Sequence, residues 1–209
     1  MKEIFSKEKW KYVFYCISHP SDGFYEVRHR ERGSVAIAWV IVFLFGVSYT
    51  VNRLCASFIV SDVNPRNVNT IQEISGVLAL FVLLSISNWS VTCLMNGEGR
   101  LKDIMTIIGY SFMPCVCLYI PATIFSQFVA DNEQVFYKLI MWIATGYTII
   151  IMLVGIMIVH NYTLGKTLLT IILTFFALLV ILFVIMMVYS LISQVITFFY
   201  SIYLELYFR

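Results

Sequence analysis

The feature that most constrains this chain is a set of five long stretches without Asp, Glu, Lys or Arg. They are residues 34–52, 74–97, 104–130, 139–159 and 167–204. A charged side chain is costly in hydrocarbon, so charge-free apolar runs of about 20 residues are typical of membrane spans. Lipid offers no water to backbone groups, and unbroken runs of this length must therefore be helical. The sequence predicts an all-α, polytopic membrane protein with five transmembrane helices.

Composition supports this class. Hydrophobic residues make up 60% of the 209 residues and charged residues 12%, about half the charged fraction of a soluble domain. Three parts are predicted from the pattern. They are a basic amphipathic arm at 1–33, a five-helix membrane domain at 34–190 and an aromatic helical extension at 191–209.

The basic residues predict the orientation of the chain. If the five runs are spans, ten of the 14 basic residues fall on one side: Lys2, Lys7, Lys9, Lys11, Arg28, Arg30, Arg32, Arg100, Lys102 and Lys166. The other side holds Arg53, Arg66, Lys138 and Arg209. Cytoplasmic loops carry the excess of Lys and Arg. We therefore predict a cytoplasmic N-terminus and, with five spans, an outside C-terminus.

The N-terminal arm divides into two amphipathic pieces at His19-Pro20. The first alternates apolar residues such as Trp10 with basic ones, and the second begins with Pro20-Ser21-Asp22-Gly23, which predicts a turn or a helix start. Apolar and basic faces of this kind favour a helix lying on an anionic membrane surface. A docking surface for a protein partner is the alternative. The residues predicted to form this lipid or partner surface are Lys7, Lys9, Trp10, Lys11, Arg28, Arg30 and Arg32.

The most specific local sequence lies between the second and third runs. Asn96-Gly97-Glu98-Gly99-Arg100 predicts a tight turn on the cytoplasmic side, because two glycines permit unusual backbone angles. It is followed by Gly109-Tyr110-Ser111 and then by Pro114 and Pro121, each of which removes a helix hydrogen bond. The third span should therefore kink or unwind, and it should lie inside the bundle, where irregular backbone is tolerated.

These residues resemble a known family. The turn with Gly97 and Gly99, the element from Gly109-Tyr110-Ser111 to Pro114, and the five-span layout look like the Yip family of Ypt/Rab-interacting integral membrane proteins. The segment His160-Asn161-Tyr162-Thr163-Leu164-Gly165-Lys166-Thr167 is similar to its bacterial branch, which implies the bacterial plasma membrane. Eukaryotic members are associated with Rab GTPases through a cytosolic arm, so a small GTPase partner follows from the resemblance alone. The arm of this chain is short and basic, unlike the long acidic arm of those members.

No catalytic residue, metal site or cofactor is predicted. The sequence has no nucleotide-binding, zinc-protease or dinucleotide motif, and its three histidines lack a nearby nucleophile at a recognisable spacing. His160 is expected to be a loop residue that caps the fourth span. The amide-bearing residues within the runs are expected to form hydrogen bonds between helices: Asn52, Asn88, Asn96, Gln127 and Gln194.

The fifth run is too long for a single crossing. Its 38 residues would extend about 57 Å, nearly twice the hydrocarbon thickness. No Gly or Pro interrupts it, so we expect a span to about residue 190 and then a bend or a continuous helix. The aromatic remainder, with Phe198, Phe199 and Tyr203, is predicted to contact lipid or another membrane protein.

Three functions are compatible with these features. The first is a non-catalytic membrane scaffold or regulatory subunit that acts through protein and lipid contacts. The second is an accessory subunit of a bacterial ABC-type transporter, and the third is a lipid-handling or small-solute channel built around the broken third span. The predicted partners are membrane lipids and other membrane-protein subunits, and not nucleic acid.

Overall fold

The computed structural model describes residues 7–30, 32–61 and 63–208, and the side chains from residue 9 onward within those ranges. Throughout them the regular structure is helical, which confirms the all-α prediction. The α-helices are α1 (Lys7–Ser18), α2 (Pro20–His29), α3 (Val35–Cys55), α4 (Thr70–Leu94), α5 (Leu101–Ser111), α6 (Met113–Ser126), α7 (Gln134–His160) and α8 (Leu164–Tyr207). Two short 3-10 helices, η1 (Pro65–Asn67) and η2 (Asp131–Glu133), lie in the connections.

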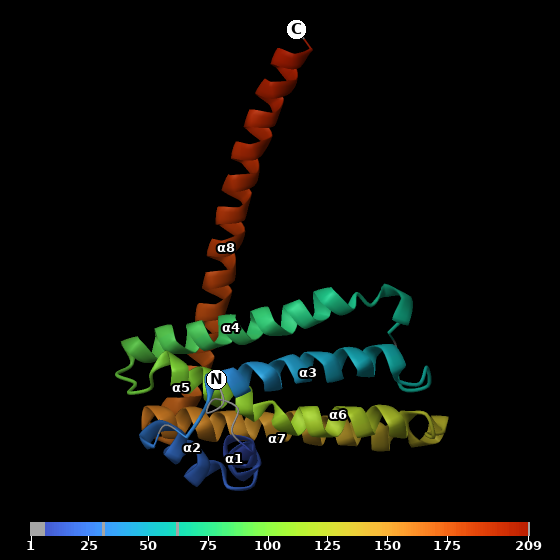
Figure 1. Cartoon of the computed structure of the whole chain (residues 1–209), viewed down its shortest axis with the longest axis vertical. Coiled ribbons are helices and arrows are strands. Elements are labelled where there is room, and N and C mark those ends of the chain that lie inside the picture. The colour runs from blue at the N-terminus through green and yellow to red at the C-terminus, as the bar shows by residue number, and fades with distance from the viewer. Residues whose placement is uncertain (1–6, 31, 62, 209) are drawn as a thin grey trace.

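Within the described residues, five helical stretches are long and apolar enough to cross a membrane, as the sequence predicted. They are α3, α4, the α5–α6 pair, α7 with its preceding turn, and α8. Helices α3, α4, α6 and α7 run side by side, and α1 and α2 lie against one end of this bundle (Figure 1). We call this end, where α3 and α5 begin and α4 and α7 finish, the arm end. The orientation of the chain across a bilayer stays a prediction.

The third span is broken where the sequence predicted. Helix α5 ends at Ser111 and α6 begins at Met113, with Pro114 in the first turn of α6. Proline has no amide hydrogen to donate to the carbonyl one turn earlier. The chain instead closes a tighter turn, in which the amide of Phe112 donates to the carbonyl of Gly109 at 3.2 Å. Helix α6 then continues through Pro121.

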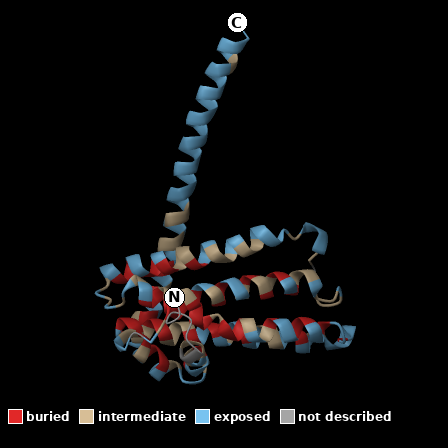
Figure 2. Cartoon of the chain, in the orientation of Figure 1, coloured by how far each residue is buried: buried red, intermediate tan, exposed pale blue. Residues whose placement is uncertain are grey.

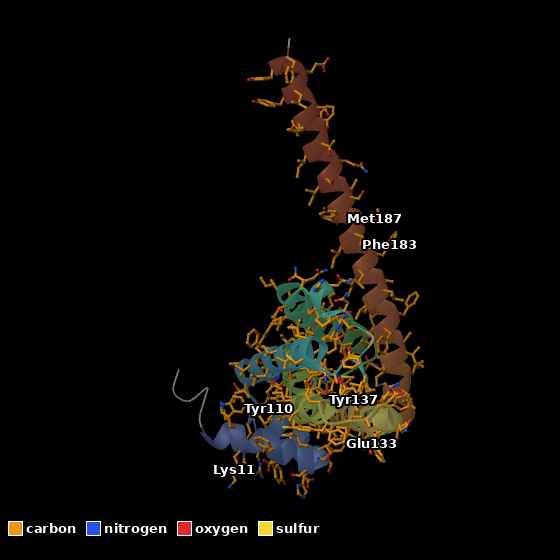
Figure 3. All side chains as sticks on the ribbon, turned by 90° about the vertical axis from the view of Figure 1, so that its right-hand side faces the viewer. Lys11, Tyr110, Glu133, Tyr137, Phe183 and Met187 are labelled. Atoms are coloured by element: carbon orange, nitrogen blue, oxygen red, sulfur yellow. The ribbon has the colours of Figure 1, made fainter. Side chains whose placement is uncertain are left out.

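Helix α5 forms the centre of the molecule. It contacts α1, α2, α3, α4 and α7, and eight of its 11 residues are buried (Figure 2). A Cβ atom on Gly109 would lie 2.5 Å from the Cβ of Ala38 and 2.9 Å from its Cα, so the backbones of α5 and α3 approach closely. The neighbouring Tyr110, which is labelled in Figure 3, is buried, and its hydroxyl accepts the amide hydrogen of Ser34 at 3.0 Å. The third span is thus the innermost one, as predicted.

Polar contacts between helices use the amides that the sequence indicated. The Asn52 side chain in α3 donates to the hydroxyls of Thr123 at 2.8 Å and Tyr137 at 2.9 Å. The Asn88 side chain in α4 donates to Thr174 of α8 at 3.2 Å. The predicted interhelical role is therefore confirmed for Asn52 and Asn88, and Gln127 after α6 likewise donates to the carbonyl of Cys55 at the end of α3. Asn96 lies in the turn that follows α4. Gln194 is different, because its amide donates to Ser190 of its own helix at 3.4 Å.

Charged residues at the far end of the bundle are paired. Arg53 near the end of α3 and Glu73 near the start of α4 form an ion pair with an N···O distance of 2.6 Å. The ion pair joins the first two spans at their shared end, where partial burial strengthens the attraction.

Helix α8 is the least covered element. It is one continuous helix of 44 residues, about 66 Å long at a rise of ~1.5 Å per residue, with no bend near residue 190. Its first turns carry Thr167, Thr170 and Thr174, all buried, and it contacts mainly α4. Beyond them it stands away from the bundle at a steep angle, and Phe183 and Met187 lie on this free part (Figure 3). Only 6% of its most apolar window is buried, against 61% in the third span.

The bundle and α8 both present apolar side chains outward. They can cross the same flat bilayer only if their axes are roughly aligned. In this structure the two axes are far from aligned (Figure 1).

The packing at Gly109 can be tested by substitution. We expect Gly109→Ala to lower the free energy of unfolding by about 1–3 kcal/mol, because the added methyl group meets the backbone of α3 rather than a flexible side chain. The control is Gly146→Ala, since no atom lies within 4 Å of the added Cβ. Replacing an interior helical glycine there should leave stability unchanged or slightly higher. Denaturant unfolding in detergent micelles measures both, and equal stabilities would contradict the close packing.

Candidate functional site at the arm end of the bundle

The arm end is built on two turns of similar shape. Helix α4 is followed by Asn96 and helix α7 by Asn161, and both asparagines have a positive φ of 54°. Asparagine adopts this left-handed conformation more readily than other residues with a side chain. Each turn closes with a backbone bond to the preceding helix, from Gly97 to the carbonyl of Thr92 at 2.7 Å and from Tyr162 to that of Met157 at 3.0 Å. The two turns can therefore lie against each other.

The glycines of the first turn allow the second turn to approach. A Cβ atom on Gly97 would lie 2.6 Å from Nδ1 of His160 and 2.7 Å from the hydroxyl oxygen of Tyr162. One on Gly99 would lie 2.5 Å from Cγ1 of Val159. Real Cβ atoms do not come this close to other atoms, so a larger residue at either position would separate the turns. The sequence attributed these glycines to backbone freedom, but neither has a positive φ, and the left-handed residue of this turn is Asn96. Close packing is what requires glycine at both positions.

His160 is the centre of this packing. It is the last residue of α7 and only 1% exposed, so the expectation of a loop histidine is wrong. Its Nδ1 accepts the amide hydrogen of Gly99 at 3.3 Å, and its ring stacks on Tyr162 with centroids 5.3 Å apart. His160, at the end of α7, thus accepts a hydrogen bond from the backbone of the distant turn that precedes α5.

Tyr162 completes the contact between the turns. Its hydroxyl donates to the carbonyl of Met95 at 3.1 Å, and the ammonium group of Lys166 lies 4.0 Å from the centre of its ring. Desolvation by burial raises the pKa of the phenol, so this hydroxyl remains a donor at neutral pH. A cation over an aromatic face is favourable. Helix α8 is therefore fixed at its start, although most of its length is free.

The arm is joined to these turns by Arg28. Its guanidinium forms an ion pair with Glu98, which lies between the two glycines, and also donates to the carbonyl of Ile158 at 3.5 Å. The Arg28 side chain is 16% exposed and that of Glu98 57%. One arginine thus contacts both turns and sets the position of α2.

An open cleft of ≈ 480 Å³ lies where the arm and the two turns meet. Its wall combines aromatic, charged and amide side chains with two apolar residues of α7. The lining residues are Tyr25, Arg28, His29, Glu98, Met157, Ile158, Asn161 and Tyr162. Such a surface can bind a polypeptide segment through apolar contact and hydrogen bonds together.

The remaining predicted surface residues of the arm have distinct environments. Arg30 and Arg32 both pair with Glu26, at 3.2 and 2.7 Å, so part of their charge is neutralised within the arm. Trp10 packs partly against the core, and Lys11 lines a second open cleft of ≈ 300 Å³. The side chain of Lys7 lies outside the described part of the chain. Whether these residues contact lipid stays a prediction.

The other predicted site residues belong to separate regions. Gly109, Tyr110 and Ser111 lie in the buried α5, where the Ser111 hydroxyl donates to the carbonyl of Ile107 at 2.8 Å, and Pro114 starts α6. These residues shape the third span and do not line the cleft. The aromatic residues of the extension are exposed on the free part of α8: Phe198, Phe199 and Tyr203.

Sequence reasoning missed several residues of the cleft. Tyr162 and Asn161 were noted only as part of a family-like segment, and Glu98 only as part of the rim of a turn. One local signal was available. Asn96 and Asn161 each follow a long apolar helix, and Asn in that position is typical of a left-handed helix cap. Their pairing in space joins segments more than 60 residues apart, and no local pattern shows that.

Chemically, the lining of the cleft offers apolar contact, an ion pair and hydrogen-bonding groups. Among the described residues, no group of three or more His, Cys, Asp or Glu side chains could hold a metal ion. The fold and the arm end define an all-helical, multi-pass membrane protein in which an N-terminal arm covers one end of the bundle.

A family model described as the Yip1 domain matches residues 14–186, so the chain belongs to the Yip1 family. The match confirms the family suggested by the glycine turn and the Gly-Tyr-Ser element. It extends from the middle of α1 into α8 and includes both turns of the arm end. No curated protein and no solved structure matches the chain.

Arm packing can be measured through Cys16. Its side chain is buried against α2, and burial raises the pKa of the thiol to about 12, so little thiolate exists at pH 8. Because the thiolate is the reactive form, we expect Cys16 to react with iodoacetamide far more slowly than the exposed Cys55. Peptide mass spectrometry after timed labelling compares the two thiols in one sample.

A substitution at Gly23 of α2 should have the opposite effect and expose Cys16 to the reagent. A Cβ atom on Gly23 would lie 2.8 Å from Sγ and 2.9 Å from Cα of Cys16. We therefore expect Gly23→Ala to separate α1 from α2 and to speed Cys16 labelling, with Cys55 unaffected. Equal labelling of both cysteines in the unsubstituted protein would show that the arm is not packed in this way.

Proposed function

We propose that this protein is a non-catalytic membrane scaffold or regulatory subunit that binds a partner protein at the arm end. The composite cleft is the observation that supports this proposal most strongly. Its wall comes from α2, the α4–α5 turn and the end of α7 with its turn, so it exists only when the arm is folded against the bundle. A protein that works through contacts needs a surface of defined shape, and this cleft is such a surface.

The chemistry of the cleft fits a polypeptide better than a small reactive substrate. Tyr25 is 55% exposed and stacks on His29 with ring centroids 4.1 Å apart. Exposed aromatic residues beside a partly buried arginine resemble the anchors that dominate protein interfaces. Glu98 offers a half-exposed carboxylate next to them. A partner segment with an apolar anchor and a basic or amide group would match both features.

Family membership supports a partner-binding role more generally. Yip family proteins are associated with small GTPases and with other membrane proteins, and the cleft lies on the side that the positive charges predict to be cytoplasmic. The arm of this chain is basic where the eukaryotic arm is acidic. We therefore propose binding at the composite cleft, and leave the GTPase as a partner suggested by family resemblance alone.

The proposal is tested by a double substitution on the surface of the cleft. Tyr25→Ala with His29→Ala removes the exposed aromatic pair but leaves the Arg28–Glu98 ion pair in place. We expect recovery of specific partner proteins to fall at least about fivefold, because loss of an interface anchor costs more than ~1 kcal/mol. Quantitative mass spectrometry of complexes isolated in mild detergent, from cells producing the tagged protein, gives the ratio.

The matched control is Phe58→Ala. Phe58 is 89% exposed and follows α3 at the opposite end of the bundle, so it tests the loss of an exposed aromatic residue elsewhere. Partner recovery should be unchanged in this variant. Equal loss of partner proteins in both variants would contradict binding at the arm end. No loss in either variant would contradict it as well.

A further inference from the structure

The outer side of the arm carries a second open cleft, with a volume of ≈ 300 Å³. We call it the α1 cleft. It is lined by three residues of α1, one of α2 and one from the segment before α3: Lys11, Tyr12, Tyr15, Glu26 and Arg32. No residue lines both this cleft and the cleft at the arm end. The α1 cleft is therefore a separate site, and its chemistry can be considered by itself.

Positive charge is in excess at the α1 cleft. Arg32 donates to Oε2 of Glu26 at 2.7 Å, and Arg30 donates to Oε1 of the same carboxylate at 3.2 Å. Each carboxylate oxygen thus faces a guanidinium group, so Glu26 repels an approaching anion little. Lys11 is exposed, and it forms no ion pair with the side chains that the structure describes. Three cations therefore lie around one carboxylate.

The guanidinium of Arg32 is held in place and can still bind a ligand. Its side chain is 52% exposed, and its bond from Nη1 to Glu26 leaves other N–H groups of the fork as donors. The wall beside it is also fixed, because the hydroxyl of Tyr12 donates to the carbonyl of Gly23 at 2.6 Å and so joins α1 to α2. A planar guanidinium next to an ammonium group is well suited to the oxygens of a phosphate.

The direction of α1 places the cleft along a membrane surface. In Figure 1, α3, α4, α6 and α7 are seen lengthwise and α1 nearly end-on. In Figure 3, which is turned by 90°, α1 runs lengthwise across the view and Lys11 lies at its outer side. Helix α1 therefore lies across the axes of these four helices. Where they cross a bilayer, α1 runs along its surface, as amphipathic interfacial helices do.

The exposed face of α1 has the composition of such a helix. Spacings of three and four residues put Lys11, Phe14, Tyr15 and Ser18 on one face, and all four are exposed. The rings of Phe14 and Tyr15 are 53% and 41% exposed. Aromatic rings beside a basic side chain are favoured at the boundary between hydrocarbon and headgroups. The face that carries Lys11 thus suits contact with lipid better than contact with water.

Arg32 lies close to the point where the chain enters the membrane. Helix α3 begins at Val35, its charge-free run begins at residue 34, and Arg32 precedes that run by two residues. A basic side chain next to the start of a span extends to the headgroups. Arg32 and the cleft that it lines therefore lie at the level of the lipid phosphates.

We propose that the α1 cleft binds the phosphate group of an anionic phospholipid, with Lys11 and Arg32 as its cationic contacts. Charge supports an anion, the guanidinium and ammonium groups support a phosphate, and the level of the cleft supports a lipid as its source. A zwitterionic headgroup fits less well, because its own ammonium group is repelled by the three cations. The bound lipid would hold the arm at the membrane surface.

This proposal is independent of the proposed function. The partner cleft at the arm end is tested through Tyr25 and His29, neither of which lines the α1 cleft. Loss of lipid binding and loss of partner binding can therefore be measured in different variants.

Native mass spectrometry of the full-length protein, titrated with phosphatidylglycerol in detergent micelles, tests the proposal. The test variant combines Lys11→Gln with Arg32→Gln. The matched control combines Arg66→Gln with Lys138→Gln, which removes two exposed positive charges outside the α1 cleft. We expect the dissociation constant of the first bound lipid to rise about tenfold in the test variant and less than about twofold in the control, because each basic residue close to an anionic headgroup strengthens the attraction.

A single substitution separates lipid binding from folding of the arm. Lys11 has no ion-pair partner among the described side chains, so Lys11→Gln should leave the packing of α1 intact and Cys16 slow to label. We expect it to raise the dissociation constant about fourfold. An unchanged constant in Lys11→Gln, or an equal rise in the double variant and its control, would show that lipid binds without a specific site and would overturn the proposal.

Two further probes identify the source of the phosphate. Phosphatidylcholine tests a zwitterionic headgroup, and inorganic phosphate added without anionic lipid tests a soluble anion. We expect binding of either probe to be the same in the unsubstituted protein and in the double variant of Lys11 and Arg32. Phosphatidylcholine that binds as tightly as phosphatidylglycerol and is lost in the double variant would contradict an anionic headgroup. Inorganic phosphate adducts that are lost in this variant would show a soluble ligand and would contradict the lipid.

Discussion

The close packing of α5 against its neighbours is the constraint on which the rest of the structure depends. Gly109 brings α5 against the backbone of α3, and Gly155 of α7 leaves space for Ile107 of α5 and Phe24 of the arm. In lipid, helices gain little from the hydrophobic effect, so they associate through small residues that allow tight van der Waals contact. Two glycines on different helices therefore place α3, α5, α7 and α2 around one centre.

The arrangement of the arm end depends on this packing around α5. Because Phe24 is fully buried beside Gly155, α2 cannot move away from α7 without exposing it. The two asparagine turns then meet at Gly97, Gly99 and His160, and Arg28 contacts both of them. The resulting cleft belongs to no single segment. This arrangement supports a protein that acts through a folded surface, and family membership is consistent with such a role.

Much of the fold could be predicted from the sequence because membrane burial leaves a strong one-dimensional signal. Charge-free runs located the spans, Pro114 located the break in the third span, and His19-Pro20 located the division between α1 and α2. The environment of His160 and the ion pair of Arg28 with Glu98 could not be predicted, because they join residues 61 to 70 positions apart. Gly109 was recognised as part of a family element, yet its physical role depends on Ala38 of another helix. The free position of α8 was also not indicated, since an apolar helix has no pattern that shows which neighbour it contacts.

The most direct test of this account is hydrogen exchange of the arm in lipid nanodiscs, compared between Phe24→Ala and Phe14→Ala. Phe24 is fully buried against the bundle, whereas Phe14 is 53% exposed. The account predicts slow exchange of the amides of residues 12–28 in the unsubstituted protein, faster exchange in Phe24→Ala and no change in Phe14→Ala. Faster exchange in Phe14→Ala alone would show that the arm is held by lipid rather than by α5 and α7, and would contradict the account.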